Sequence, residues 1–244
     1  MYRGFRLKNV SSLEDEYYRS AKNIYDEIKK QMKIDLREYL TEDKSLDAES
    51  LKNTFFPKGE DFDIFLSHSH GDEKKAIRLA GYFKEKFGLN TFIDSCLWGN
   101  VVDLLKEIDD KYSRHDTISS SYSYEKRNIS TSHCHIMLST SLTNMIDKIE
   151  CFIFLDTEKT VKLVEGIEKT YSCWIYHELE ISKIIRRTFP KRKRTLLEFS
   201  MEADTLVMEY NISSEHLTDI DFNHLKSLSN NNGKNSLDLW YEKF

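Results

Sequence analysis

The chain has 244 residues, of which 39% are hydrophobic and 12% aromatic, which excludes a disordered chain and allows a packed core. Its formal net charge of −5 excludes a general electrostatic preference for nucleic acid. No apolar run approaches the roughly 18–20 residues of a membrane-spanning helix, and the first residues lack the apolar core of a secretory signal. We therefore expect a soluble, cytoplasmic protein whose partners include neither nucleic acid nor membrane.

The first part of the chain is expected to be a helical extension. Between residues 12 and 40 apolar side chains recur at helical spacing, which predicts one or two helices. Pro57 follows, just before the first strand-like segment. We therefore predict an N-terminal helical extension, residues 1–57, that packs on the main domain or on a second copy of the chain. The main domain is residues 58–244, with a C-terminal limit between 190 and 244.

A strand–helix–strand unit follows Pro57. The apolar run at 63–67 predicts a strand, and apolar side chains at every third or fourth position of 74–87 predict an amphipathic helix. Gly88 ends that helix, and 90–94 is a second short strand. Because a crossover of this length joins parallel strands, we expect an α/β fold with a central, mostly parallel sheet flanked by helices.

Polar residues stand where these two strands end. Ser67 and His68 close the first strand, and Asp94 closes the second. Ligands of parallel sheets bind at the carboxyl ends of the strands, so we expect these three residues to contact a substrate. The loop from Ser67 to Gly71 also leads into a helix, whose first backbone N–H groups can hold a pyrophosphate.

The middle of the chain continues the alternation of helices and strands. Helical spacing of apolar residues covers 101–112 and 134–149, with a polar, serine-rich loop at 114–124 between them. The run CFIFLD at 151–156 predicts the third strand.

A helix with an unusual face follows Ser172, which is a good N-cap. Trp174 and Glu178 lie on one face of this helix together with apolar residues, because positions four apart are neighbours. One interpretation is a solvated glutamate at the edge of an apolar stripe. The other is a functional carboxylate.

The C-terminal part is harder to interpret. Segments 195–199 and 205–210 can be strands, yet the five residues between them are too few for a helical crossover. Either one of them pairs antiparallel or one is wrongly assigned. Residues 217–228 predict a helix, 230–235 a polar loop, and the aromatic segment 237–244 is expected to pack back onto the fold.

The chain resembles the TIR (Toll/interleukin-1 receptor) family. The matching residues are Asp63–His68, Phe92–Asp94, Trp98–Gly99, and Trp174 with Glu178 four residues later. The resemblance implies a flavodoxin-like TIR fold. It also implies that Glu178 is the catalytic carboxylate of an enzyme that breaks the nicotinamide–ribose bond of NAD, in the manner of an NAD nucleosidase or ADP-ribosyl cyclase.

This chemistry needs few groups. Nicotinamide leaves as a neutral base, so no general acid is required, unlike ordinary glycoside hydrolysis. One carboxylate can stabilise the positive charge that grows on the ribose and orient its hydroxyls. Trp98 and Trp174 can stack on substrate rings, although either can instead be a core tryptophan. NAD is then the substrate, and neither a cofactor nor a metal is expected, because the His-x-His pairs at 68–70 and 133–135 lack further ligands at fixed spacing.

The length of the segment between Trp98 and Cys151 is similar to bacterial TIR proteins of antiviral defence, especially the Thoeris type. That likeness implies a signalling nucleotide as product, a separate effector protein, and a homo-oligomer in which a second protomer completes the site, with residues 95–100 as the contact. Two rival functions remain: a non-catalytic TIR scaffold, and a sensor that binds NAD without cleaving it. The acceptor of the ADP-ribosyl group stays open between water, internal cyclisation and an amino acid.

Overall fold

The computed structural model describes residues 1–10, 13–30, 35–55, 62–116, 121–190, 210–211, 213–228 and 233–244, with the side chains of 24, 27–30, 55, 96–100 and 210–211 left out. The chain divides into two compact units. The first unit is Met1–Asn23, Gly59–Asp94 and Thr143–Phe244, and the second is Ile24–Lys58 and Ser95–Leu142.

The elements are, in chain order, β1 (Arg3–Lys8), α1 (Asp15–Lys30), η1 (Leu36–Tyr39), α2 (Ala48–Phe55), β2 (Ile64–Ser67), η2 (His70–Asp72), α3 (Glu73–Phe87), β3 (Thr91–Ile93), α4 (Asp94–Tyr112), α5 (Tyr124–Lys148), β4 (Cys151–Leu155), β5 (Lys162–Val164), β6 (Ile167–Thr170), α6 (Cys173–Ile184), β7 (Tyr210–Asn211), β8 (Thr218–Asp221), α7 (Phe222–Ser227) and α8 (Lys234–Lys243). Both η elements are short 3₁₀ helices.

The first unit contains a parallel sheet. Its strand order is β3-β2-β4-β1-β8, and every strand pair in it is parallel. The expected α/β fold, with helices flanking a parallel sheet in a roughly flavodoxin-like order, is therefore confirmed. The predicted strands at 63–67, 90–94 and 151–156 are β2, β3 and β4, and the predicted helix at 74–87 is α3. Gly88 ends α3 in the left-handed region, with φ 70°.

Strand β1 corrects the expectation of a purely helical N-terminal extension. Only helices were predicted before residue 57, but Arg3–Lys8 lies inside the sheet, between β4 and β8. Phe5 and Leu7 are fully buried. The basic residues Arg3 and Arg6 interrupt the apolar pattern, so the strand cannot be recognised from the sequence. The expected helix is present as α1, and the division of the chain at residue 57 stays a prediction.

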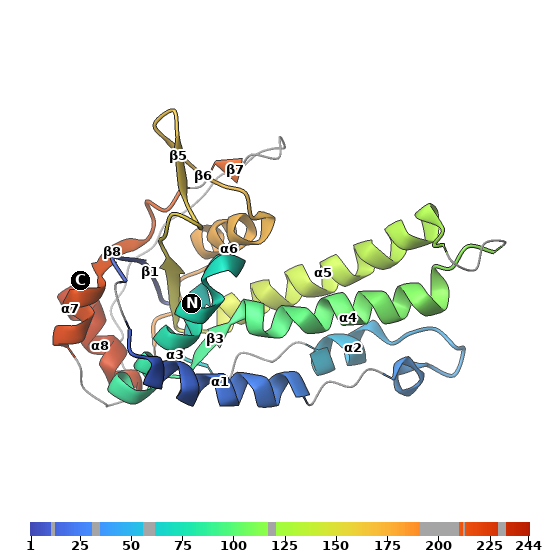
Figure 1. Cartoon of the computed structure of the whole chain (residues 1–244), viewed down its shortest axis with the longest axis horizontal. Coiled ribbons are helices and arrows are strands. Elements are labelled where there is room, and N and C mark those ends of the chain that lie inside the picture. Colours follow the sequence, from blue (N-terminus) through green and yellow to red (C-terminus); the bar gives the residue numbers. More distant parts are fainter. Residues whose placement is uncertain are drawn as a thin grey trace. The chain divides into compact units, whose positions relative to one another are not determined.

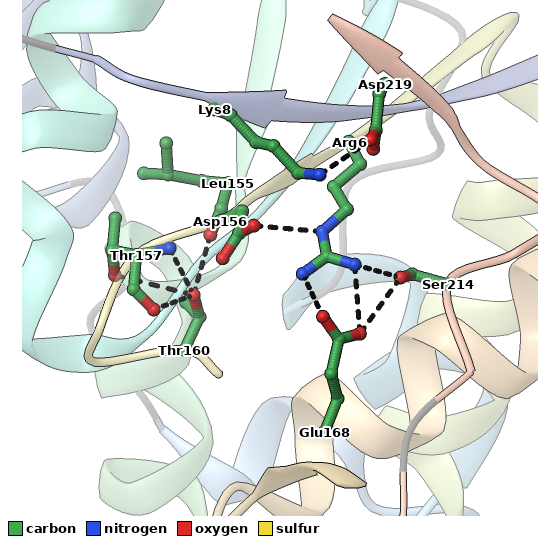
Figure 2. A network of polar contacts seen from close by, with 9 residues as sticks. All are labelled: Arg6, Lys8, Leu155, Asp156, Thr157, Thr160, Glu168, Ser214 and Asp219. Carbon is green, nitrogen blue, oxygen red and sulfur yellow. Dashed lines mark hydrogen bonds and ion pairs between the residues drawn. The ribbon is translucent and has the colours of Figure 1, made fainter. Parts of the chain in front are cut away.

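Arg6 joins several elements of the first unit (Figure 2). Its guanidinium donates to Asp156 after β4 at 2.9 Å, to Glu168 of β6, and to Ser214 before β8 at 2.6 Å. Because two carboxylates surround it, the pKa of Arg6 is raised in spite of its partial burial. The neighbouring Lys8 forms a more exposed pair with Asp219.

Helices α1 and α3 approach closely within the first unit. A Cβ atom added at Gly81 would lie 2.2 Å from the carbonyl oxygen of Tyr17, so only glycine allows the two backbones this distance. The rings of Tyr17 and Tyr82 meet edge to face beside that contact. At the other end of the chain α8 buries Trp240 completely against Phe5 and Phe87, which confirms that segment 237–244 packs back onto the fold.

Two further corrections concern the C-terminal part. The predicted helix at 217–228 is in fact strand β8 followed by the short helix α7, whose start is capped by Asp221. Strands β5 and β6 were not predicted, and with β7 they form a second sheet of order β5-β6-β7 whose strand pairs are antiparallel. The predicted strand 195–199 lies outside the described residues, as does 205–210 apart from Tyr210, which belongs to β7.

The second unit is helical. Figure 1 shows its two long helices, α4 and α5, side by side, and Arg127 of α5 bonds Asp109 of α4 at 2.9 Å. Helix α5 starts at residue 124, ten residues earlier than predicted. The core of this unit joins these helices to η1 and α2 through Leu36, Leu51, Leu104, Ile108, Cys134 and Met137. In the described part of the chain, no helix combines the length and the hydropathy needed to cross a bilayer.

Candidate functional site

The predicted site residues gather where the strand order reverses direction. The chain moves from β2 to its neighbour β3, and then returns to β4 on the other side of β2. The carboxyl ends of β2 and β4 therefore lie at a topological switch point, where α/β sheets of this kind bind ligands. Ser67 ends β2 there and lies in register with Phe154 of β4.

Helix α6 brings Glu178 to this edge. Ser172 caps the helix as predicted, because its hydroxyl accepts from the backbone N–H of Ile175 at 3.2 Å. Two turns later Glu178 is completely buried, and the Ser67 hydroxyl donates to its Oε2 at 2.6 Å. Its other oxygen, Oε1, has no hydrogen-bond partner among the described residues. The interpretation of Glu178 as a solvated residue at the edge of a stripe is therefore wrong.

The surroundings of Glu178 favour its neutral form. Burial removes the carboxylate from water, and the negative charge of Asp94 repels it, so the pKa of Glu178 lies well above its ordinary value of 4.5. The hydrogen bond from Ser67 acts in the opposite direction. Two acidic groups therefore share a buried site, in which the negative charge of one disfavours the ionisation of the other.

His68 and Asp94 form a second part of the site. Nδ1 of His68 lies 3.1 Å from Oδ1 of Asp94 and 3.2 Å from the carbonyl oxygen of Leu66. Both neighbours are acceptors, so Nδ1 carries a proton. Burial opposes the imidazolium, but the charge of Asp94 and the hydrogen bonds outweigh it and raise the pKa of His68 above 6.5. The His68 side chain is fully buried and that of Asp94 is 9% exposed.

The two predicted tryptophans differ in what can be said of them. Trp174 lies in the first turn of α6, one turn before Glu178, and it is half-buried with its ring perpendicular to that of His177. Trp98 belongs to α4, but its side chain lies outside the described residues. Ser67, His68, Asp94 and Glu178 are thus brought together, Trp174 lies on the same helix as Glu178, and stacking by either tryptophan stays a prediction.

The loops that follow β2 and β4 are joined by hydrogen bonds that were not predicted from the sequence. Asp72, at the end of the loop after β2, is buried and accepts from the hydroxyls of Ser69 and Thr157. From the loop after β4, Lys159 donates to the carbonyl oxygen of Gly71 at 2.7 Å. These contacts hold the proposed pyrophosphate loop to the loop after β4. No local pattern signals them, because Asp72 and Thr157 are 85 positions apart.

The described side chains include no group of three or more His, Cys, Asp or Glu residues placed to hold a metal ion. Cys134 and Cys151 are buried thiols, Cys173 is exposed, and none of these three forms a disulfide. Burial raises the pKa of the Cys134 thiol to about 11, which makes it a poor nucleophile.

Comparisons with known proteins add no family. No family model matches the chain, and no curated protein or solved structure matches it.

Proposed function

We propose that this chain is a TIR-like enzyme that cleaves the nicotinamide–ribose bond of NAD, with Glu178 as the catalytic carboxylate. The observation that carries the proposal is the burial of Glu178 at the switch point of the sheet, bonded to Ser67 and beside Asp94. Trp174 precedes it by one helical turn, as in the enzymatic members of the family that the chain resembles.

A structural role for Glu178 explains this environment poorly. A buried glutamate that only holds a fold together is normally paired with a cation or has both oxygens bonded. Glu178 instead faces the charge of another carboxylate and has an oxygen without a hydrogen-bond partner. Carboxyl groups whose surroundings disfavour ionisation are frequent at active sites, where the strain serves chemistry.

The chemistry follows from charge. The nicotinamide ring of NAD is cationic, and positive charge passes to the ribose as the bond breaks. A cation beside Glu178 favours its ionised form, which can then stabilise the growing charge on the ribose. The unpartnered Oε1 can accept a hydrogen bond from a ribose hydroxyl.

The biological setting belongs to the same proposal. By likeness to bacterial TIR proteins of the Thoeris type, the ADP-ribosyl part becomes a signalling nucleotide that activates a separate effector in antiviral defence. A homo-oligomer would complete the site, with residues 95–100 as the contact. The alternative is a non-catalytic TIR scaffold, which the full burial of Glu178 also allows, since a buried carboxylate needs rearrangement before a substrate can reach it.

The test is NAD turnover by the full chain as wild type and as Glu178→Gln, with all products resolved by mass, repeated in lysates of phage-infected cells that express each form. Glu180→Gln is the matched control, because Glu180 lies on the same helix but is partly exposed and near Lys183. We expect nicotinamide release by wild type and Glu180→Gln, and a loss of about 100-fold or more in Glu178→Gln. Intact NAD with all three proteins, in both settings, would contradict the catalytic proposal and leave the two non-catalytic functions, the scaffold and the sensor that binds NAD without cleaving it.

A further inference from the structure

We propose that the outer face of α5 is an interface between two copies of this chain, in which the two α5 helices pack antiparallel. This contact is separate from the one expected at residues 95–100, which lie at the start of α4. It does not depend on the proposed enzymatic activity.

The outer face of α5 is apolar and uncharged. Ile129 is 61% exposed and Ile136 is 67% exposed, although isoleucine is among the residues that are most often buried. Between residues 128 and 146 the sequence contains no Asp, Glu, Lys or Arg, whereas 32% of the whole chain is charged. A helix that faces only water normally carries charged side chains on that side. The outer face of α5 therefore suits another protein surface better than it suits water.

Helix α4, in the same unit, has the ordinary pattern. Its exposed residues include Asp103, Lys106 and Glu107, with Val102 among them. A single exposed apolar residue among charged ones is common and needs no partner. On α5 the exposed residues between and after the two isoleucines are instead Ser132, His133, His135 and Thr140.

The spacing of the two isoleucines suits an antiparallel pair of identical helices. Ile129 and Ile136 are seven residues apart, which is two helical turns, so they lie in line along α5. When a second α5 packs about a two-fold axis between positions 132 and 133, Ile129 of each copy meets Ile136 of the other. Ser132 meets His133 at the centre. Two apolar contacts form, and no carboxylate, ammonium or guanidinium group is buried.

A second copy is the partner that the charge of this face favours. Burying a charge without its counter-charge is costly, so an uncharged face is best covered by another uncharged face. Of the helices that form the core of this unit, α2 carries Glu49 and Lys52, and α4 carries the charges named above. The surface that complements α5 is therefore α5 itself.

The length of the helix sets the strength of the contact. Helix α5 has 25 residues, and its uncharged part from 128 to 146 is about 28 Å long. Stable specific interfaces bury about 1,200–2,000 Å² in total, and a single helix pair of this length lies near or below the lower limit. We therefore expect a weak, reversible dimer with a dissociation constant of about 10–100 μM.

The experiment is sedimentation velocity of the full chain, from about 1 μM to about 500 μM, so that the range spans the expected dissociation constant. Ile129→Lys and Ile136→Glu each place a charge against an isoleucine of the second copy, so we expect each to weaken association by about 10-fold or more. Val102→Lys is the matched control, because Val102 is also 67% exposed but lies on α4. It should leave the dissociation constant within about 2-fold of the wild type.

A mixture of the two α5 variants tests the antiparallel pairing. In a mixed dimer the ammonium introduced at position 129 faces the carboxylate introduced at position 136, while the other pair of isoleucines is unchanged. We expect the mixture to associate about 10-fold more strongly than either variant alone. A parallel pair would place position 129 against position 129, so the two introduced charges would not meet and the mixture would gain nothing.

Three results would overturn the proposal. A wild type that stays monomeric over the whole concentration range would exclude the second copy and leave this face to a different partner. Association as strong as in the wild type in both α5 variants would place the contact elsewhere on the chain. A mixture that associates no more strongly than its components would contradict the antiparallel pair. None of these results depends on whether the chain cleaves NAD.

Discussion

Ser67 is the residue whose hydroxyl compensates part of the cost of burying Glu178. It donates to Oε2 at 2.6 Å and opposes the rise in the pKa of that carboxyl. Ser67→Ala would leave a second oxygen of Glu178 without a donor. We expect a further rise of the Glu178 titration midpoint by NMR, and a loss of about 1–2 kcal/mol in the free energy of unfolding in urea.

Ser69→Ala is the control for this prediction. Ser69 lies in the same loop and is also buried, but its hydroxyl donates to Asp72 at 3.2 Å. It should leave the titration of Glu178 where it is in the wild type. If the titration midpoint of Glu178 were the same in Ser67→Ala and Ser69→Ala, the effect assigned to the Ser67 hydroxyl would be wrong.

At this scale the sequence predicted the positions of the site residues but not their states. Ser67, His68 and Asp94 could be placed because strand ends are visible in the apolar pattern. The hydrogen bond between Ser67 and Glu178 joins residues 111 positions apart, so neither the burial of Glu178 nor the rise in its pKa follows from the local pattern. The sequence also cannot show that the His68 ring is enclosed, and its contact with a substrate stays a prediction.

Among the elements, β1 is held in place by the charge network of Arg6. The two carboxylates around Arg6 are 19% and 33% exposed, so they are only partly screened by water. Arg6→Ala would leave both without their cation. We expect a loss of about 1–3 kcal/mol in the free energy of unfolding, measured in urea at neutral pH.

Lys8→Ala provides the comparison on the same strand. Lys8 and Asp219 are 36% and 62% exposed, and exposed pairs contribute at most about 1 kcal/mol. Equal losses in the two variants would show that the Arg6 network contributes no more than a surface ion pair. Salt should reduce the effect of Lys8→Ala more than that of Arg6→Ala.

The elements that could be predicted are those whose pattern is local. Helix α3 has apolar residues at every third or fourth position, and β2 and β4 are continuous apolar runs. Strand β1 was missed because two arginines interrupt it, and the side-chain partners of both, such as Tyr241 for Arg3 and Asp156 for Arg6, are distant in the sequence. Strand β8 was taken for part of a helix, because its assignment depends on pairing with β1, about two hundred positions away.

For the molecule as a whole, Glu178 should lower stability at neutral pH. A carboxyl whose pKa is raised on folding retains its proton in the native state above 4.5, where the unfolded chain has already lost it. The free energy of unfolding therefore falls as pH rises from about 4.5 towards the native pKa, and stays low above it. Glu178→Gln keeps the shape of the side chain and cannot ionise, so this loss should disappear.

We expect Glu178→Gln to be more stable than the wild type at pH 7 by about 0.5–2 kcal/mol, and close to it in stability at pH 4. The measurement is urea unfolding of both proteins from pH 4 to pH 8, taking the difference at each pH so that other titrating groups cancel. A raised pKa of His68 gives stability that is lost as pH rises, in both proteins. A difference that stays constant across this pH range would contradict the raised pKa of Glu178. A difference in the free energy of unfolding that grows with pH would mean that the wild type is less stable because Glu178 lies in a site that disfavours its charge. Such a cost in stability is expected of a carboxyl group that serves catalysis.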